Sequence, residues 1–391
     1  MKPLEGITIL EFSTMITASF AAMMMAEQGA RVIKVEPVEA GDPMRYIGSE
    51  KAGISSLFAN CNRGKESLRV NMKTDEGQSL IRDMICEIDV LITNFRPGVM
   101  ERLNLGSEAL RTMNPRLIYT AVSGFGKRGG LSRAPAYDSV IQAYAGLTAI
   151  QGLAGEPALF RTLICDKITA YTACQATTCA LFHRERTGEG QHIDLSMLDA
   201  SLFFIFPDGF QNHTLLDEDV VEHPWLIDLT KLTLTKDGAV VVAAATQDMQ
   251  MRTLIALGME QLLAEERFNT IEKRVAHWDE FNGLVNEAYL QYTSDEVIQK
   301  LQDADVPCAL CLSQDEVLTQ EQLTANDSVE VIEHPLMGRM RVVKYPACFA
   351  GERLPPARPS PDHGQHTEDV LKSFAVCEDR IRSLMRSGVV C

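Results

Sequence analysis

The chain has 391 residues, of which 46% are hydrophobic and 23% are charged, as in an ordinary globular protein. Its formal net charge of −16 predicts no general attraction to nucleic acid or anionic lipid, although a local basic pocket for a phosphorylated ligand is compatible with it. The ten cysteines are scattered, and the longest early apolar run, residues 18–26, is too short for a membrane span and lacks the basic lead-in of a signal peptide. We therefore expect a cytoplasmic protein of two or three domains.

The N-terminal third alternates strand-like and helix-like segments. Residues 7–12 are a short apolar run, residues 18–28 read as a helix closed by Gly29, and residues 31–35 are apolar again, so a parallel βαβ unit is predicted. The alternation continues with a helix over 74–87, a strand over 90–93, a helix from 107 and a strand over 117–122. We expect a Rossmann-like parallel sheet. The first loop carries no GxGxxG, so a nicotinamide dinucleotide is not expected.

The pattern of the sequence changes near residue 205. Residues 167–183 predict one long helix, residues 192–196 a strand, and residues 208–224 are polar and irregular. Asp237-Gly238 lies between two apolar runs and predicts a hairpin over residues 232–245. The fold class is therefore α/β, with a smaller α+β domain. The expected division is a large domain over 1–205, a linker over 206–225, a small domain over 226–315, and a segment over 316–391 that returns to the large domain.

Two short motifs are interpreted as ordinary structure. Cys308 and Cys311 have a CxxC spacing, but they lie in the apolar run 306–312 without a second pair, which favours a buried strand over a metal or redox site. His363 and His366 belong to a polar loop and are expected to be solvated. No metal site is therefore expected.

Asp166 precedes the predicted long helix and has two compatible interpretations. Aspartate is a favoured N-cap residue, so it could simply begin the helix. A carboxylate at the positive end of a buried helix would also be kept ionised by the terminal amides, and it could attack a thioester to give a mixed anhydride.

A set of short segments, in one order along residues 3–372, gives the chain a specific resemblance. They are PLEGI (3–7), GARVIKVE (29–36), GDPMR (41–45), NRGKES (62–67), NFRPG (94–98), NPRLIY (114–119), SGFG (123–126), AYD (136–138), Asp166, RTGEGQ (186–191), Met197 with Asp199, VPC (306–308) and HPLMG (334–338). The chain resembles the family III CoA-transferases, which include the formyl-CoA:oxalate and carnitine CoA-transferases and the related 2-methylacyl-CoA racemases.

The resemblance implies a CoA-transferase that moves CoA from an acyl-CoA donor to a carboxylic acid acceptor. It implies that Asp166 is the nucleophile and passes through aspartyl anhydride and aspartyl-CoA thioester intermediates, with CoA as substrate and no permanent cofactor. It also implies a ring-shaped chain of two domains, interlocked with a partner in a homodimer.

The resemblance further implies which residues contact CoA. They are Thr14, Ile16, Thr17, Val70, Lys73, Asn94, Phe95, Arg102, Tyr137 and Met197. Three positions depart from the family. Thr14 and Ile16 stand where many members have His and Gln, and Pro37 stands where many have an arginine, so the contacts to the adenosine are the less defined part of the expectation.

Other activities remain as alternatives. A 2-methylacyl-CoA racemase pairs its aspartate with a histidine, but Tyr137 and Asp138 occupy that region and the first histidine is His183. A CoA-binding protein without catalysis is the third hypothesis. The acids exchanged are not encoded in any motif; formyl-CoA with oxalate is disfavoured because residues 226–260 contain only two glycines. Arg161 and Lys167 suggest a small dicarboxylate such as succinate.

Overall fold

The computed structural model describes residues 2–152, 155–222, 225 and 232–391. The chain forms two units, one made of Met1–Phe206 with Thr324–Cys391 and the other of Pro207–Leu323. The division falls inside α9 (Met197–Gly209), so a helix continues into the region where the sequence suggested a linker from residue 206. Part of the expected small domain, residues 226–231, lies outside the described residues.

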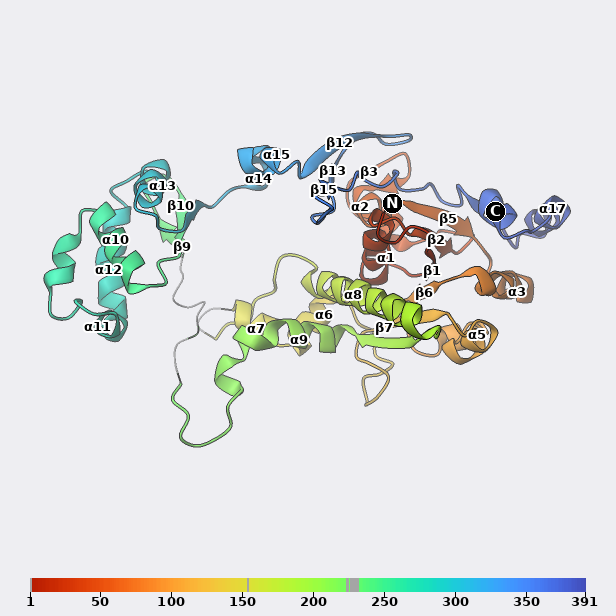
Figure 1. Cartoon of the computed structure of the whole chain (residues 1–391), viewed down its shortest axis with the longest axis horizontal. Coiled ribbons are helices and arrows are strands. Elements are labelled where there is room, and N and C mark those ends of the chain that lie inside the picture. Colours follow the sequence, from red (N-terminus) through yellow and green to blue (C-terminus); the bar gives the residue numbers. More distant parts are fainter. Residues whose placement is uncertain (1, 153–154, 223–224, 226–231) are drawn as a thin grey trace. The chain divides into compact units, whose positions relative to one another are not determined.

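A six-stranded sheet forms the centre of the first unit, and every pairing in it is parallel (Figure 1). The predicted parallel α/β sheet is therefore confirmed. In spatial order its strands are β5 (Lys65–Arg69), β2 (Arg31–Glu36), β1 (Thr8–Phe12), β6 (Val90–Thr93), β7 (Ile118–Ser123) and β8 (His192–Ser196).

The chain order reverses between β1 and β6. From β1 the chain first builds outward through β2 and β5, and then returns to add β6, β7 and β8 on the other side. The two strands end together, because Phe12 pairs with Thr93. In open parallel sheets a ligand binds beyond the carboxyl ends of the strands at such a switch point. The topology therefore points to the loops that follow β1 and β6.

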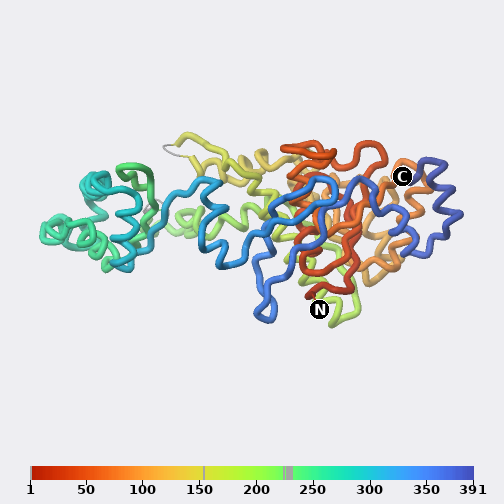
Figure 2. Tube along the Cα trace, turned by 90° about the horizontal axis from the view of Figure 1, so that it is seen from above, coloured from red at the N-terminus to blue at the C-terminus, as the bar shows by residue number. Residues whose placement is uncertain are grey.

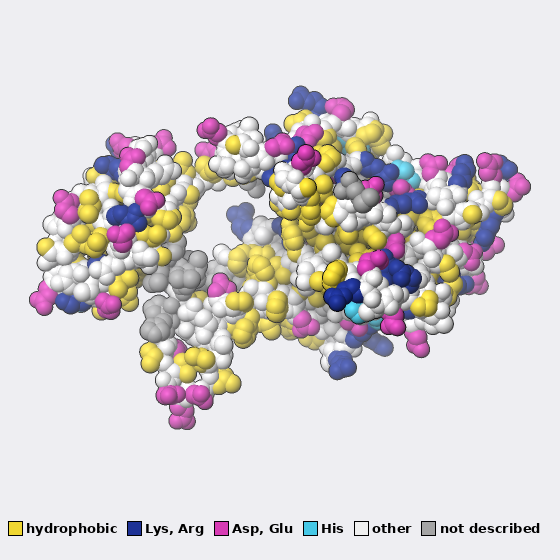
Figure 3. Space-filling view, viewed as in Figure 1, with side chains coloured by type: hydrophobic (Ala, Val, Ile, Leu, Met, Phe, Trp, Pro, Cys, Tyr) yellow, Lys and Arg dark blue, Asp and Glu magenta, His cyan; other side chains and the backbone are white. Residues whose placement is uncertain are grey.

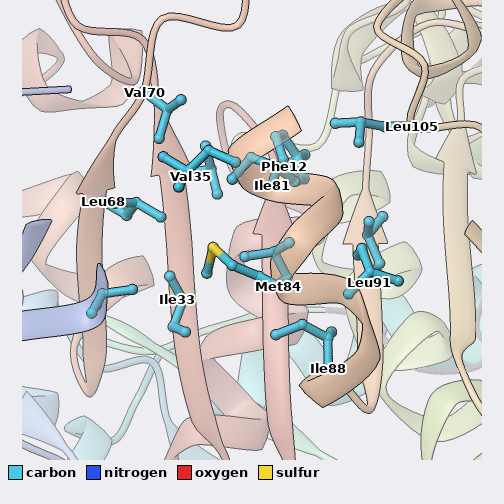
Figure 4. Close-up of a cluster of buried hydrophobic side chains, with 14 of the residues drawn as sticks. Phe12, Ile33, Val35, Leu68, Val70, Ile81, Met84, Ile88, Leu91 and Leu105 are labelled. Atoms are coloured by element: carbon cyan, nitrogen blue, oxygen red, sulfur yellow. The ribbon is translucent and has the colours of Figure 1, made fainter. Parts of the chain in front are cut away.

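A large hydrophobic core covers one face of this sheet. Helix α3 (Asp75–Met84) lies over β1, β2 and β5, and its Ile81 and Met84 belong to the same buried cluster as Ile33 and Leu68 from the strands (Figure 4). Thr74 caps this helix, since its Oγ1 accepts a hydrogen bond of 3.1 Å from the Gly77 amide. The helices that complete this face are α5 (Ser107–Met113), α16 (Thr367–Ser373) and α17 (Glu378–Arg386).

The C-terminal segment is part of this core although it is almost 300 residues from β5 in sequence. Val370 and Leu371 of α16 are fully buried in the same cluster as Leu68. Figure 2 shows the blue C-terminal trace running alongside the red N-terminal strands. The final segment therefore returns to the large unit.

The other face of the sheet carries α1 (Thr17–Glu27) packed against the long α8 (Ile164–Thr187). Small residues on α8, including the fully buried Ala170 and Ala173, let the two helices approach closely. Gly188 ends α8 with φ of 80°, a left-handed cap that favours glycine. This packing brings the N-termini of α1 and α8 together.

The second unit is a small antiparallel sheet with helices. The predicted hairpin is confirmed: β9 (Leu232–Leu234) pairs with β10 (Ala239–Val242) across Asp237-Gly238. Among the described residues, the third strand, β11 (Cys308–Leu310), pairs with β10 alone, and it is mostly exposed, so the expectation of a buried strand there was wrong. An edge strand keeps one side open however apolar its sequence is. The helices are α10 (Gln247–Ala256), η5 (Glu260–Ala264), α11 (Ile271–Ala276), α12 (Trp278–Tyr289) and α13 (Ser294–Asp303).

The remaining elements are short. They are η1 (Pro43–Tyr46), β3 (Glu50–Lys51), β4 (Ile54–Ser55), α2 (Ser56–Asn62), η2 (Ile85–Glu87), α4 (Val99–Arg102), α6 (Asp138–Tyr144), α7 (Leu147–Gln151), η3 (Gln211–His213), α14 (Gln314–Thr319), α15 (Glu321–Ala325), β12 (Val329–His334), β13 (Gly338–Val343), β14 (Cys348–Phe349) and β15 (Glu352–Arg353).

Candidate active site

A cavity of about 410 Å³ lies at the switch point of the parallel sheet. Its walls come from the loops after β1, β6 and β7 and from the first residues of α6, α8 and α9. Asp166, Asp138 and Arg96 are the charged side chains among its described lining residues. The fold thus places a carboxylate pair where the topology predicts a ligand site.

Asp166 is held against the wall of this cavity by the neighbouring helix. The Thr17 hydroxyl, on the first residue of α1, donates a hydrogen bond of 2.8 Å to Asp166 Oδ1. Thr17 is 4% exposed, and the Asp166 side chain makes no ion pair with any described residue. The carboxylate therefore faces the cavity with one neutral hydrogen-bond donor and without a paired cation.

Asp166 is the third residue of α8 and does not cap it, so the N-cap interpretation was wrong. The helix begins two residues earlier at Ile164, and Leu163 occupies the cap position without a side-chain hydrogen bond. Instead, the Asp166 amide donates 3.0 Å to Asp138 Oδ1 from the start of α6. Asp138, 28 residues away in sequence, therefore accepts the hydrogen bond from the first turn of α8 that a local cap residue would normally accept.

The environment raises the pKa of Asp166 from its ordinary value near 4 to about 6. Burial is the largest cause; the hydrogen bond from Thr17 opposes it, the nearby negative charge of Asp138 adds to it, and Lys167 opposes it. The helix amides, which were expected to keep Asp166 ionised, are not among the causes of this shift. Asp166 is still mostly ionised at neutral pH, but as a poorly solvated carboxylate.

A buried glutamine fixes the second carboxylate. Gln142 and Asp138 are both 2% exposed, and Gln142 Nε2 donates 2.6 Å to Asp138 Oδ2. The same amide group bonds the segment before α8: its Oε1 accepts 2.9 Å from the Phe160 amide, and its Nε2 reaches the Thr162 carbonyl at 3.3 Å. Asp138 is thereby locked in the orientation that meets the Asp166 amide.

The loop after β1 is pinned to the loop after β6. The Thr14 amide donates 3.0 Å to Asn94 Oδ1, and Asn94 Nδ2 donates 2.7 Å to the Thr14 carbonyl. Phe95, next to Asn94, packs edge-on against Phe12 with ring centroids 6.4 Å apart. These contacts hold the two walls of the cavity in a defined spacing.

The structure brings most of the predicted site residues to this cavity. Those that line it are Thr14, Thr17, Asn94, Phe95, Tyr137, Asp166 and Met197. Tyr137, 67% exposed, presents its ring at the rim.

Four predicted residues do not line the cavity. Val70 is fully buried in the core beside α3, so its side chain is closed to a ligand (Figure 4). Ile16 is 4% exposed and packs against Met44 and Phe58. Lys73 is exposed and pairs with Glu39 at 2.8 Å, and Arg102 is an exposed residue at the end of α4. The roles of these four in binding CoA stay predictions.

Sequence reasoning missed Arg96 and Gln142. Arg96 is exposed at the cavity wall, and the structure gives its guanidinium no partner among the described residues. Arg96 belongs to the NFRPG segment, but the resemblance to the family implied only Asn94 and Phe95 of that segment as CoA contacts. Gln142 gave no signal, because its partners lie on segments that only the fold brings together.

The described part of the chain contains neither a metal-binding cluster nor a membrane-spanning helix. Among the described residues, no three His, Cys, Asp or Glu side chains gather as they would around a metal ion. The described helices are each too short or too polar to span a bilayer. His363 is half-buried, with its Nε2 2.9 Å from the Pro37 carbonyl, so it is not simply solvated as expected.

Known proteins resemble this chain over nearly its whole length. It is 32% identical to an acyl-CoA transferase of Fusarium pseudograminearum, over 99% of this chain and 88% of that protein. It is 28% identical to the human succinyl-CoA:glutarate CoA-transferase, over 100% of this chain and 90% of that protein. A CAIB/BAIF family protein from Brucella suis has the same fold, with a TM-score of 0.83, 27% identity, and 95% and 99% of the two chains covered.

The family model described as CoA-transferase family III matches residues 4–367. That range includes the cavity, Asp166 and the strands that carry its walls. The switch-point cavity, the near-complete match and the named relatives lead to one conclusion: the chain belongs to CoA-transferase family III and is a CoA-transferase.

Proposed function

We propose that Asp166 is the nucleophile of CoA transfer and that the cavity at the switch point holds the reacting end of the acyl-CoA. The observation that carries this proposal is the Asp166 carboxylate itself. It faces the cavity, accepts a hydrogen bond from Thr17 and has no paired cation among the described residues. A carboxylate without a neutralising partner keeps its electron pair available for attack.

The proposed reaction divides one transfer into four acyl exchanges. An Asp166 oxygen attacks the thioester carbonyl of the donor, and the C–S bond breaks to release CoA thiolate and leave an aspartyl acyl anhydride. The thiolate then attacks the aspartyl carbonyl, which releases the donor acid and forms an aspartyl-CoA thioester. The acceptor carboxylate attacks that thioester and expels the thiolate. The thiolate finally attacks the acceptor carbonyl of the second anhydride, giving acceptor-CoA and free Asp166.

The surroundings of Asp166 suit this chemistry. Partial desolvation, which raises its pKa to about 6, leaves the carboxylate ionised at neutral pH but weakly hydrated. A weakly hydrated carboxylate loses less solvation on attack than one in water. The Thr17 hydroxyl orients one oxygen, and the other is left for the substrate. No metal or redox group takes part in any step of this scheme.

For CoA we propose a path along the loops after β1 and β6. Thr14, Thr17, Asn94, Phe95, Tyr137 and Met197 line the cavity and are in position to meet the pantetheine arm. Arg96 adds a cation at the same wall, which suits a phosphate oxygen. Lys73 and Arg102 are candidates to bind the more distant phosphates of CoA. CoA is then a substrate and not a permanent cofactor.

A small dicarboxylate is the proposed acid. The human relative is named for succinyl-CoA and glutarate, and a relative from Agrobacterium fabrum, 29% identical, for succinate and glutarate. In this chain Arg161 and Lys167 flank the segment that begins α8, and Lys167 contributes a positive charge at Asp166. A second carboxylate on the substrate would be attracted to these cations.

The racemase alternative is less well supported. No histidine is among the described residues that line the cavity, and Tyr137 and Asp138 occupy the region where a racemase would place one. A 2-methylacyl-CoA incubated in deuterated water should therefore gain no α-deuterium in the absence of an acceptor. Rapid exchange without CoA transfer would favour the racemase.

We also propose a cytoplasmic homodimer in which two ring-shaped chains interlock. Hydrophobic side chains gather over α9 (Figure 3), where Phe203 is 83% and Phe204 59% exposed, more than a solitary chain normally leaves open. An interlocked dimer should survive dilution to nanomolar concentration, because separation requires a ring to open. Light scattering that finds a stable monomer would contradict it.

Replacing Asp166 with asparagine tests the nucleophile. The amide keeps the shape and can accept from Thr17, but it cannot form the anhydride. We expect Asp166→Asn to bind CoA like the wild type and to lose transfer almost completely. With acyl-CoA alone, hydroxylamine should convert the wild-type adduct into a hydroxamate that mass spectrometry locates at Asp166. Substantial turnover in the variant, or a hydroxamate on another residue, would overturn the assignment; Asp138 would be tested next.

A further inference from the structure

One residue of the cavity wall has a backbone conformation that its side chain disfavours. Met15, in the loop between β1 and α1, has a φ of 61°, in the left-handed region. There the Cβ atom of an L-residue crowds the following carbonyl oxygen, so such residues are uncommon outside glycine, asparagine and aspartate. Met15 also lines the cavity. Something in the surrounding structure must hold it in this state.

Asp42 accepts the hydrogen bond that holds Met15 in this conformation. The Met15 amide donates 3.1 Å to Asp42 Oδ1, and the same oxygen accepts 2.9 Å from the Met44 amide as the cap of η1. Asp42 is 1% exposed, and its own amide donates 3.1 Å to Glu36 Oε1. Asp42 therefore links the loop after β1 to the end of β2, the first through its carboxylate and the second through its own amide.

Asp42 is itself anchored by a buried charge network. Its Oδ2 lies 3.0 Å from Lys34 Nζ, and Lys34 pairs with Glu11 at 2.8 Å. The side chains of Lys34, Glu11 and Asp42 are shut off from solvent, and Lys34 and Glu11 belong to neighbouring strands of the sheet. A carboxylate held on this platform has little freedom to move away from Met15.

The pinned residue is two positions before the group that contacts Asp166. Thr17 follows Met15 closely and donates its hydroxyl to Asp166 Oδ1, while Thr14 is fixed on the other side by Asn94. If Met15 relaxed to negative φ, the chain path into α1 would change and both neighbours would shift. The position of the loop therefore depends on the Asp42–Met15 bond.

We propose that Asp42 is a positioning residue for the transfer reaction: by holding Met15 in the left-handed conformation, it sets the cavity wall that receives the acyl-CoA and aligns Thr17 with Asp166. This inference rests on the proposed function of the cavity. It also gives a role to Asp42 in the GDPMR segment, which the sequence marked without assigning it any chemistry.

A rescue experiment tests this role. Asp42→Ala removes the bond, and we expect the KM for acyl-CoA to rise about 5- to 30-fold, as the left-handed penalty implies. Met15→Gly removes that penalty, so Asp42→Ala with Met15→Gly should recover most of the loss. Met15→Ala is the matched control: it also deletes the side chain but keeps the penalty, and should give no recovery. Equal KM values for the two double variants would overturn the proposal.

Asp42→Asn separates the hydrogen bond from the charge. The amide retains an oxygen that accepts from Met15 and Met44, but it no longer pairs with Lys34. We expect its KM to stay within about threefold of wild type, well below the effect of alanine. An asparagine variant as impaired as the alanine variant would show that Asp42 only balances the Lys34 charge, against the proposal.

Isomeric side chains at Met15 decide the matter even if Asp42→Ala fails to fold. Leucine and isoleucine have the same volume, but only isoleucine is β-branched and strongly disfavours positive φ. We expect Met15→Ile to raise the KM at least fivefold above that of Met15→Leu, and equal values would contradict the inference. Calorimetry of CoA binding to wild type is measured first, since a wild type that binds no CoA refutes the proposed function rather than the role of Asp42.

Discussion

The fold shifts the pKa values of two carboxyl groups in the large unit in opposite directions: that of Glu11 is lowered and that of Asp166 is raised. Burial would raise the pKa of Glu11, but the charges and hydrogen bonds of Lys34 and Lys65 bring it below the ordinary value. Its partners lie close, with Lys34 Nζ at 2.8 Å and Lys65 Nζ at 2.7 Å. Burial also raises the pKa of Asp166, and the positive charge of Lys167 lowers it too little to reverse this effect.

The difference separates a structural carboxylate from a reactive one. Glu11 is fully buried, paired twice and closed to any ligand, so its charge serves to join β1, β2 and β5. Asp166 lies at the cavity with a hydroxyl and a second carboxylate as neighbours. The first site resists change because its charges balance, while the second retains a charge that a substrate can use.

Breaking the balanced site should have the largest effect. Lys34→Met removes the ammonium that Glu11 and Asp42 share, and leaves buried negative charge without compensation. We expect a loss of about 3–5 kcal/mol in the free energy of unfolding, measured by denaturant titration. Lys73→Met is the control, because the exposed Lys73–Glu39 pair should leave the unfolding midpoint unchanged. Similar unfolding midpoints for Lys34→Met and Lys73→Met would show that the buried ion pairs contribute no more to stability than the exposed one.

Removing the unpaired charge of Asp166 should instead increase the free energy of unfolding. Since the folded protein raises the pKa of Asp166 from about 4 to about 6, it binds that proton more tightly than the unfolded chain does. The free energy of unfolding therefore falls as pH rises through this window. At pH 7.5 we expect Asp166→Asn to be about 1–2 kcal/mol more stable than wild type, a value reduced from the full shift for partial solvent access.

The pH dependence checks that stability prediction. Unfolding titrations at pH 7.5 and pH 5 should show the advantage of Asp166→Asn shrinking at the lower pH, where wild-type Asp166 takes up its proton in the folded state. An advantage independent of pH would mean that the substitution acts through packing and not through the charge.

The smallest expected effect concerns the partner carboxylate. The negative charge of Asp138 contributes to the raised pKa of Asp166, so Asp138→Asn should lower that pKa. Because the ionised form attacks, the acidic limb of kcat/KM for wild type should lie near pH 6 and move to lower pH in the variant. Glu39→Gln, at an exposed pair, should leave the limb in place. A limb that does not move would show that Asp138 acts only through its hydrogen bond to the Asp166 amide.

The sequence was sufficient wherever structure depends on near neighbours. The alternation of strands and helices predicted the parallel sheet and a helix that begins near residue 74, and Asp237-Gly238 predicted the hairpin. The order of short segments predicted the family, and with it attention to Asp166. Each of these depends on patterns a few residues long or on their order, which the chain carries before it folds.

Tertiary structure decided everything that depends on distant partners. Thr17 meets Asp166 across 149 positions and Asp138 meets it across 28, so neither the cap of α8 nor the raised pKa was readable from local sequence. The burial of the Val70 side chain in the core beside α3 depends in the same way on segments that only the fold brings together. The physical reason is that desolvation and charge–charge energy depend on distances in space, and only the packing of α1, α6 and α8 around the switch point sets those distances.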